Sequence, residues 1–289
     1  MTRPLLIVNA DDYGLTEAVS TGILRGHRFG VVSSTSVLAV APAFATCGKW
    51  LADEPDLGVG AHLAAVGEDP PLLSAREVPT LVDRRGRFPA TWRAFLQRDM
   101  ANLIDPADLF REFAAQIDAI ADLGVVISHI DTHQHLHLWP KVRRVVLDLA
   151  LAAGVPAVRV PRSHRRHPVA GGVKRLSRNL AARAEGAGLC TPVDAAGIDE
   201  VGSVDAAGFE AALDGFMARR AATAEIGTHP GEADDPDRHR YHWGYQWGAE
   251  LELLTSGRTR RAIDQRGFQL GSYHDLVRRQ AGVVGPSRP

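Results

Sequence analysis

The chain is organised around one stretch, Ser128-His129-Ile130-Asp131-Thr132-His133-Gln134-His135-Leu136-His137-Leu138-Trp139-Pro140, which holds four histidines within nine residues. Its ligand-capable side chains all have odd numbers: His129, Asp131, His133, His135 and His137. Residues two apart in a β-strand point to the same face, so a strand here would aim these groups in one direction. The pattern therefore predicts a metal or catalytic site.

Plainer interpretations of such a run exist. A single histidine is more often an ordinary surface or core residue than a ligand, and a histidine-rich tail would be polar and without fixed structure. This run is instead entered from the apolar Val125-Val126-Ile127 and is interleaved with Ile130 and Leu136, which favours a site. Spacing alone leaves open a two-histidine, one-carboxylate iron site around His129 and Asp131, as in an oxygenase.

Composition excludes several classes of protein. The 289 residues include 33 Lys and Arg against 34 Asp and Glu, a net charge of -1, which argues against nucleic acid as a partner. Two cysteines, Cys47 and Cys190, do not indicate a disulfide framework. The N-terminus lacks a long apolar signal core, and no stretch approaches the ~20 apolar residues of a membrane span. We expect a soluble, cytoplasmic protein with no membrane span.

Short apolar runs alternate with helical patterns along the chain. Strands are expected at residues 5–8, 31–40, 57–63, 125–129, 157–162, 224–228 and 268–270. Helices are expected after an N-cap at Thr16, at 41–51, 91–100, 106–123, 140–154, 172–185 and 206–220, and after a cap at Thr255 or Ser256. Residues 64–90 are expected to form a long loop.

This alternation favours a mostly parallel sheet, arranged as a barrel or as a doubly wound sheet. At this length the chain is expected to form one domain over residues 1–289, with a disordered tail from about residue 279.

Several of the expected strands end in groups that suit metal chemistry. Asp11 and Asp12 follow the first strand, His62 ends the third, and His229 follows the strand at 224–228. In a barrel the carboxyl ends of all parallel strands lie on one rim, so these groups should meet the histidine run. One carboxylate with two imidazoles leaves positions open for water and substrate, which is typical of a catalytic metal site.

Asp11, Asp12 and His229 can supply the metal-binding carboxylate, the general base and the general acid of such a site. One aspartate binds the metal, the other takes the proton of an attacking water, and His229 protonates the leaving group. Structural roles remain open for each: the aspartate pair can cap a helix or a turn, His229 can be a turn residue before Pro230-Gly231, and Asp131 can orient a ligating histidine.

Four aromatic residues follow His229 closely: Tyr241, Trp243, Tyr245 and Trp247. Aromatic faces with polar rims bind small ligands such as sugars, so this patch predicts carbohydrate contact. Equally, Trp243 and Trp247 can staple a helix to the barrel. Arg159 and Arg162, near the end of another expected strand, are further candidates for binding an anionic or hydroxyl-rich substrate.

Motifs spread over nearly the whole chain resemble, in order, those of the YdjC/ChbG family of carbohydrate deacetylases. They are Asn9-Ala10-Asp11-Asp12-Tyr13-Gly14-Leu15, Gly60-Ala61-His62-Leu63, the histidine run from Ser128 to His137, Thr228-His229-Pro230-Gly231, and Gly271-Ser272-Tyr273-His274-Asp275.

The resemblance implies a distorted (β/α) TIM-like barrel of the glycoside hydrolase/deacetylase type. It implies metal-dependent removal of an N-acetyl group from an amino sugar, such as an acetylated chitooligosaccharide. Carried over to this chain, it places one divalent metal ion on Asp12, His62 and His133, with Asp11 as general base and His229 as general acid.

The same comparison leaves His129, Asp131 and His135 as supporting groups around the ligands, with the roles of His135 and His137 open. Magnesium or zinc suits these ligands best, and manganese, cobalt or nickel also fits. Members of the family often form dimers, so a homodimer is expected. The chain departs from the family at Tyr13, where Phe is common.

Two rival functions remain. A metal-dependent phosphoester hydrolase on a similar barrel would use the same ligands, and a non-catalytic homologue would bind sugar without turnover. The sequence does not name the acetylated sugar or the native metal.

Overall fold

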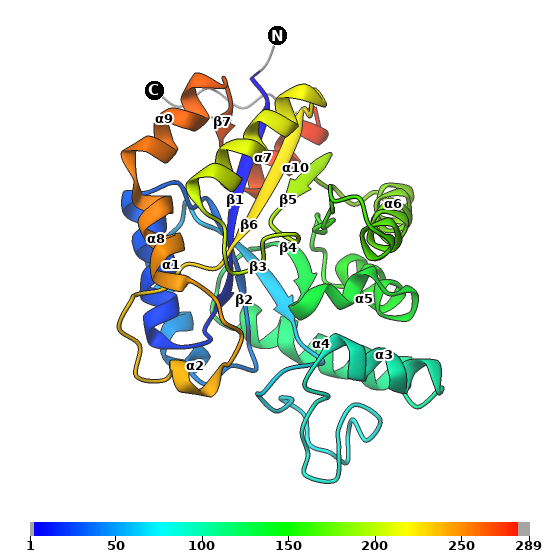
Figure 1. Cartoon of the computed structure of the whole chain (residues 1–289). Coiled ribbons are helices and arrows are strands. Elements are labelled where there is room, and N and C mark those ends of the chain that lie inside the picture. The colour runs from blue at the N-terminus through cyan, green and yellow to red at the C-terminus, as the bar shows by residue number, and fades with distance from the viewer. Residues whose placement is uncertain (1–2, 283–289) are drawn as a thin grey trace.

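Strand β1, Leu5–Tyr13, lies in the middle of a single curled parallel sheet, and all nine of its residues are buried (Figure 1). The computed structural model describes residues 3–282. Within that range the sheet has seven strands, and six follow the order β4-β3-β2-β1-β6-β5, while β7 pairs with β1. The other strands are β2 Ser34–Val37, β3 Gly58–Leu63, β4 Ile127–Thr132, β5 Asp194–Ala196, β6 Thr223–Thr228 and β7 Gln269–Leu270.

The sheet curls back toward itself beyond β4. Ile130 of β4 forms a parallel bridge with Val158, and Ala157 forms another with Cys190. The segment that contains Cys190 runs on into β5, which pairs with β6. The expected distorted (β/α) barrel is therefore confirmed, with this side completed by isolated bridges.

Helices cover the outside of the curled sheet (Figure 1). They are α1 Glu17–Phe29, α2 Phe44–Cys47, α3 Trp92–Met100, α4 Pro106–Ala121, α5 Pro140–Ala152, α6 Pro168–Gly186, α7 Ala206–Ala218, α8 Trp247–Thr255, α9 Gly257–Gln265 and α10 Tyr273–Gln280, with 3-10 helices η1 Gly48–Asp53, η2 His133–Leu138 and η3 Arg238–Arg240. The expected N-caps are confirmed at Thr16, whose hydroxyl accepts from the N–H of Val19, and at Ser256. Residues 64–90 form the expected long loop.

Two expectations about strands are wrong. Residues 157–162 make only the bridges described above, because Pro156 and Pro161 lack the N–H groups that a regular ladder needs. The histidine run is not one strand either. Strand β4 ends at Thr132, and η2 follows with left-handed φ angles of 52° at Gln134 and 54° at His135.

No helix within residues 3–282 is long and apolar enough to cross a bilayer. The tail expected from about residue 279 overlaps the end of α10 at Gln280, and residues 283–289 lie outside the described part of the chain.

Candidate active site

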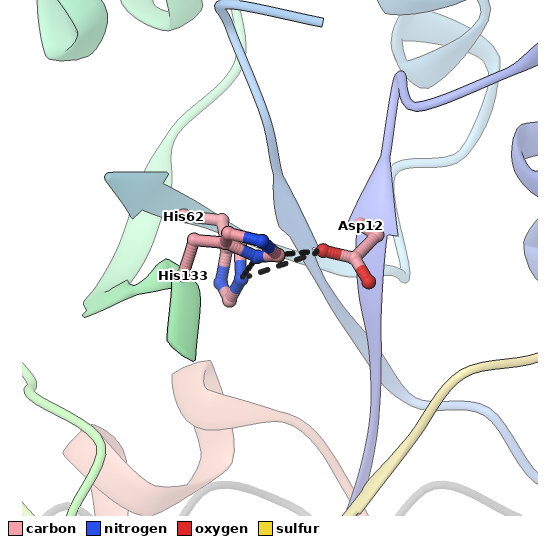
Figure 2. Close-up of side chains that lie close together, drawn as sticks. All are labelled: Asp12, His62 and His133. Carbon is pink, nitrogen blue, oxygen red and sulfur yellow. Dashed lines mark hydrogen bonds and ion pairs between the residues drawn. The ribbon is translucent and has the colours of Figure 1, made fainter. Parts of the chain in front are cut away.

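Asp12, His62 and His133 converge at the carboxyl ends of the strands (Figure 2). Oδ1 of Asp12 lies 3.5 Å from Nε2 of His62 and 3.4 Å from Nδ1 of His133, and the two ring nitrogens are 3.4 Å apart. The three side chains are only 1%, 3% and 6% exposed, respectively. They come from the end of β1, from β3 and from the first residue of η2, so the sequence-predicted trio is brought together.

The backbone of β1 explains how adjacent aspartates reach the same site. Neighbouring strand residues normally point to opposite faces. Here the pairing of β1 with β2 shifts register between Ala10 and Tyr13, and Asp12 takes a left-handed φ of 70°. Such a bulge re-aims a side chain, so Asp11 and Asp12 both lie beside His62.

The turn after β4 places His133. The hydroxyl of Thr132 lies 2.9 Å from the backbone nitrogen of His137 and 2.7 Å from its Nδ1, which holds the first turn of η2. Left-handed residues are uncommon outside glycine and concentrate at functional sites. The two consecutive ones after His133 turn the chain sharply away from the strand direction.

A divalent cation fits the buried trio. Oδ1 of Asp12 has no hydrogen-bond partner among the described residues, although it is buried. Burial alone would raise the pKa of Asp12, but the imidazoles of His133 and His62 lower it to about 2. One carboxylate with two imidazoles is a donor set that zinc and related ions accept. These three residues can therefore hold a divalent ion.

Asp131 sets the orientation of His62. Nδ1 of His62 lies 2.7 Å from Oδ1 of Asp131, which leaves Nε2 facing Asp12. Burial acts to lower the pKa of His62, but Asp131 overrides it and raises the pKa to about 9. A bound cation would displace that proton, since ligating imidazoles must be neutral.

The carboxylate of Asp11 forms a bidentate ion pair with Arg159. Two guanidinium nitrogens of Arg159 donate to the two carboxylate oxygens of Asp11 at 2.7 and 2.8 Å, and Nδ2 of Asn9 donates at 2.7 Å. Burial acts to raise the pKa of Asp11, but Arg159 and His62 outweigh it and lower the pKa. The carboxylate of Asp11 is therefore held in its ionised form and in one orientation, and its Oδ2 lies 3.8 Å from Nε2 of His229.

The guanidinium of Arg159 lies among several carboxylates. Besides Asp11, the guanidinium contacts Asp131 at 2.5 Å and Glu225 at 2.7 Å, and the residue is 3% exposed. A guanidinium paired with three carboxylates holds those carboxylates in place, and the expected contact of Arg159 with an anionic or hydroxyl-rich substrate stays a prediction. Arg162 is half-buried, and its Nε has no partner among the described residues.

His229 is held through its backbone. Its N–H donates to Oε2 of the buried Glu250 at 2.6 Å, and the ring meets the edge of Tyr245 with centroids 4.7 Å apart. Nδ1 of His229 is buried without a partner in the described part of the chain.

The other histidines of the run occupy different surroundings. His129 is fully buried and stacks on Tyr273 with ring centroids 3.7 Å apart. Its ring nitrogens form hydrogen bonds with Ser36 and Ser128, and burial lowers its pKa to about 3. His137 contacts Thr132 and the backbone oxygen of Arg159. Neither is a member of the buried trio.

The aromatic patch divides into two pairs. The ring of Trp243 lies 5.2 Å from that of His133, and Tyr245 contacts His229, so these two border the site. Tyr241 and Trp247 are 3% and 4% exposed. Trp247 begins α8, and its buried ring supports the structural interpretation at that position.

A small pocket adjoins Asp11 and His229. Its lining consists of Asp11, His135, Arg159, Glu225 and His229, together with Pro161, Ala195, Ala196, Gly197, Ile198, Val201 and Gly227. This is where the structure places His135.

Sequence reasoning missed several residues of this network. Glu225 links Nε of Arg159 to the hydroxyl of Tyr273, which donates to Glu225 at 2.7 Å, and Ser36 donates to Asp131 at 3.1 Å. Glu225 did carry a signal, since a glutamate within an apolar strand is rarely buried unless it is paired. Ser36 had none, because serines are ordinary in its strand.

The fold and the site together define a class: a curled parallel (β/α) barrel whose strand ends join an aspartate and two histidines beside a second aspartate and a third histidine. The chain belongs to the YdjC family, since the family described as YdjC-like protein matches residues 5–265. The resemblance noted in the sequence is thereby confirmed.

Relatives match over almost the full length. A chitooligosaccharide deacetylase of Proteus mirabilis is 31% identical over 278 residues, covering 94% of this chain and 99% of its own. A carbohydrate deacetylase of Geobacillus stearothermophilus is 31% identical over 274 residues, covering 94% and 98%. A crystal structure from Enterococcus faecalis, described as a candidate cellobiose-phosphate cleavage protein, matches with a TM-score of 0.78 at 27% identity over 95% of this chain and 99% of its own.

Proposed function

We propose that this protein is a metal-dependent hydrolase that removes the N-acetyl group from an acetylated amino sugar, such as a chitooligosaccharide. The observation that carries the proposal is the placement of Asp11 and His229 beside the buried trio of Asp12, His62 and His133. The names of the two deacetylase relatives support the choice of substrate class.

The reaction is hydrolysis of an amide. Water adds to the acetyl carbon, the C–N bond breaks, and acetate and the free amino sugar leave. A divalent ion held by Asp12, His62 and His133 would polarise the acetyl carbonyl and lower the pKa of water.

Asp11 is the residue we assign to accept the proton of the attacking water. Its low pKa means that it is ionised at neutral pH, and the paired contacts from Arg159 fix both of its oxygens. His229, whose Nε2 lies 3.8 Å from Oδ2 of Asp11, is assigned to protonate the departing nitrogen, since the amine is a poor leaving group until it gains a proton. Trp243 and Tyr245 border this position and can support the sugar ring.

The direct test measures acetate release from a panel of N-acetylated sugars by metal-stripped protein, with magnesium, zinc, manganese, cobalt and nickel restored one at a time. We expect release only with metal. Phosphate release from sugar phosphates, measured in parallel, separates the deacetylase from the phosphoester hydrolase.

Asp11→Asn tests the proposed base. Because general base catalysis contributes about 100-fold or more, we expect kcat to fall by at least that factor while sugar binding persists. Asp264→Asn, on the exposed side of α9, is the matched control and should leave kcat unchanged. Unchanged acetate release in Asp11→Asn would overturn the assignment.

A further inference from the structure

The small pocket beside Asp11 and His229 has a composition that the metal chemistry does not explain. Its lining includes neither Asp12, His62 nor His133 in the described part of the chain. Beyond the catalytic pair, small and apolar residues from β5, from the segment that follows it and from β6 form much of its wall. The pocket is thus a second compartment that opens on the two proton-transfer residues.

A compartment of this kind suits the hydrolysis of an N-acyl group. The attacked carbon must lie within reach of both Asp11 and His229, and its remaining substituent is the alkyl part of the acyl group. That part needs an apolar space next to the same two residues, because apolar surface is most stable away from water. The walls at Ala195, Ile198 and Val201 provide such a surface.

We infer that this pocket receives the acyl chain and limits it to about the size of an acetyl group. The inference rests on the proposed deacetylase function and adds to it a determinant of acyl-chain length, located where β5 and β6 lie side by side. Longer N-acyl groups such as propionyl and butyryl would not fit.

Gly227 offers a way to make the pocket smaller by one methyl group. Among the described residues, a Cβ added there would meet Nη2 of Arg159 at 3.7 Å and the backbone oxygen of Ala196 at 3.8 Å, both ordinary contact distances. Arg159 and Ala196 themselves line the pocket, so the added methyl would enter it. Gly197 is unsuitable, because its φ is 109° and a Cβ would lie 2.4 Å from the oxygen of Gly227.

The experiment compares kcat/KM for N-formyl, N-acetyl, N-propionyl and N-butyryl forms of one amino sugar. One methylene in an apolar pocket changes discrimination about 10-fold or more. Gly227→Ala should therefore lower the acetyl-to-formyl ratio about 10-fold. Ile198→Ala, which enlarges the pocket, should raise the propionyl-to-acetyl ratio by a similar factor.

Control variants on α6 make the same glycine-to-alanine change and a similar truncation of a branched aliphatic side chain. Gly172→Ala adds a Cβ with no atom of residues 3–282 within 4 Å, and Val169→Ala shortens a side chain that is 66% exposed. Both should keep the wild-type ratios, and thermal unfolding verifies that every variant is folded.

The outcomes separate the two proposals. If the wild type releases no acid from any N-acyl sugar with metal restored, the proposed function fails and the pocket assignment fails with it. If the wild type is active and folded Gly227→Ala and Ile198→Ala keep its acyl-length ratios, only the pocket assignment is overturned.

Discussion

At the scale of single residues, Asp131 decides which nitrogen of His62 is offered to a cation. The bond of 2.7 Å between Nδ1 of His62 and Oδ1 of Asp131 fixes the ring so that Nε2 faces Asp12. A carboxylate in this position orients the ring and raises its basicity, and losing it typically costs 10–100-fold in metal affinity, as an order of magnitude. Asp131→Asn should therefore weaken zinc binding by about that factor.

Calorimetric titration of metal-free protein with zinc measures this effect. His133→Ala removes a proposed ligand outright and should weaken binding more than Asp131→Asn does. His242→Ala deletes an exposed imidazole as a control and should bind zinc as the wild type does. Equal zinc affinity in the wild type and Asp131→Asn would contradict the orienting role.

At the scale of elements, Glu250 ties helix α8 to the end of β6. Its carboxylate oxygens accept from the N–H of Val204 at 3.0 Å and from the N–H of His229 at 2.6 Å. An amide has only one accepting oxygen, so Glu250→Gln would leave one buried N–H unpaired or facing an NH2 group. We expect a loss of about 1–3 kcal/mol in unfolding free energy.

Denaturant unfolding followed by circular dichroism tests that loss. Glu252→Gln, on the exposed side of the same helix, makes the same chemical change without the buried contacts and should be nearly neutral. Because the lost contact also fixes the backbone of His229, Glu250→Gln should lower kcat as well. An unfolding midpoint equal to that of the wild type would show that α8 does not depend on Glu250.

At the scale of the whole molecule, the repeating strand and helix pattern was enough to predict a mostly parallel sheet, and the family resemblance favoured a barrel over a doubly wound sheet. Most of the expected apolar runs form parallel strands, although residues 157–162 form only isolated bridges, and parallel strands send their carboxyl ends to one rim. For this reason the sequence positions of Asp11, Asp12 and His62 at strand ends are enough to predict that they share one site. Strand β5 was missed because Asp194–Ala196 is too short to carry a periodic pattern.

The parts that could not be predicted depend on neighbours far apart in the sequence. The role of Glu225 depends on its hydrogen bonds with Arg159, 66 residues away, and with Tyr273 of α10. The turn after His133 depends on left-handed backbone angles at Gln134 and His135. Because neither residue is glycine, the sequence does not indicate that the histidine run leaves the strand here. The local sequence pattern predicts helices and strands, whereas the register between strands determines which charged side chains meet in this network.

The candidate metal site joins side chains from parts of the chain that are far apart in the sequence. Asp12 and His62 lie on β1 and β3 with β2 between them, and His133 lies 71 residues beyond His62. An ion bound by all three would bind the folded state in preference to the unfolded chain, so it must stabilise the fold. At a free ion concentration 100 times Kd the gain is about 2.7 kcal/mol.

For a protein of this size, that gain should raise the Tm by about 4 °C when zinc is added to chelator-treated protein. Thermal unfolding with and without zinc measures the shift. His133→Ala should lose most of it, because two donors that remain from β1 and β3 bind far more weakly than three. His242→Ala should keep the full shift. If zinc raised the Tm equally in His133→Ala and in the wild type, the stabilising ion would have to bind elsewhere. The proposed mechanism would then lose its premise that Asp12, His62 and His133 hold the ion.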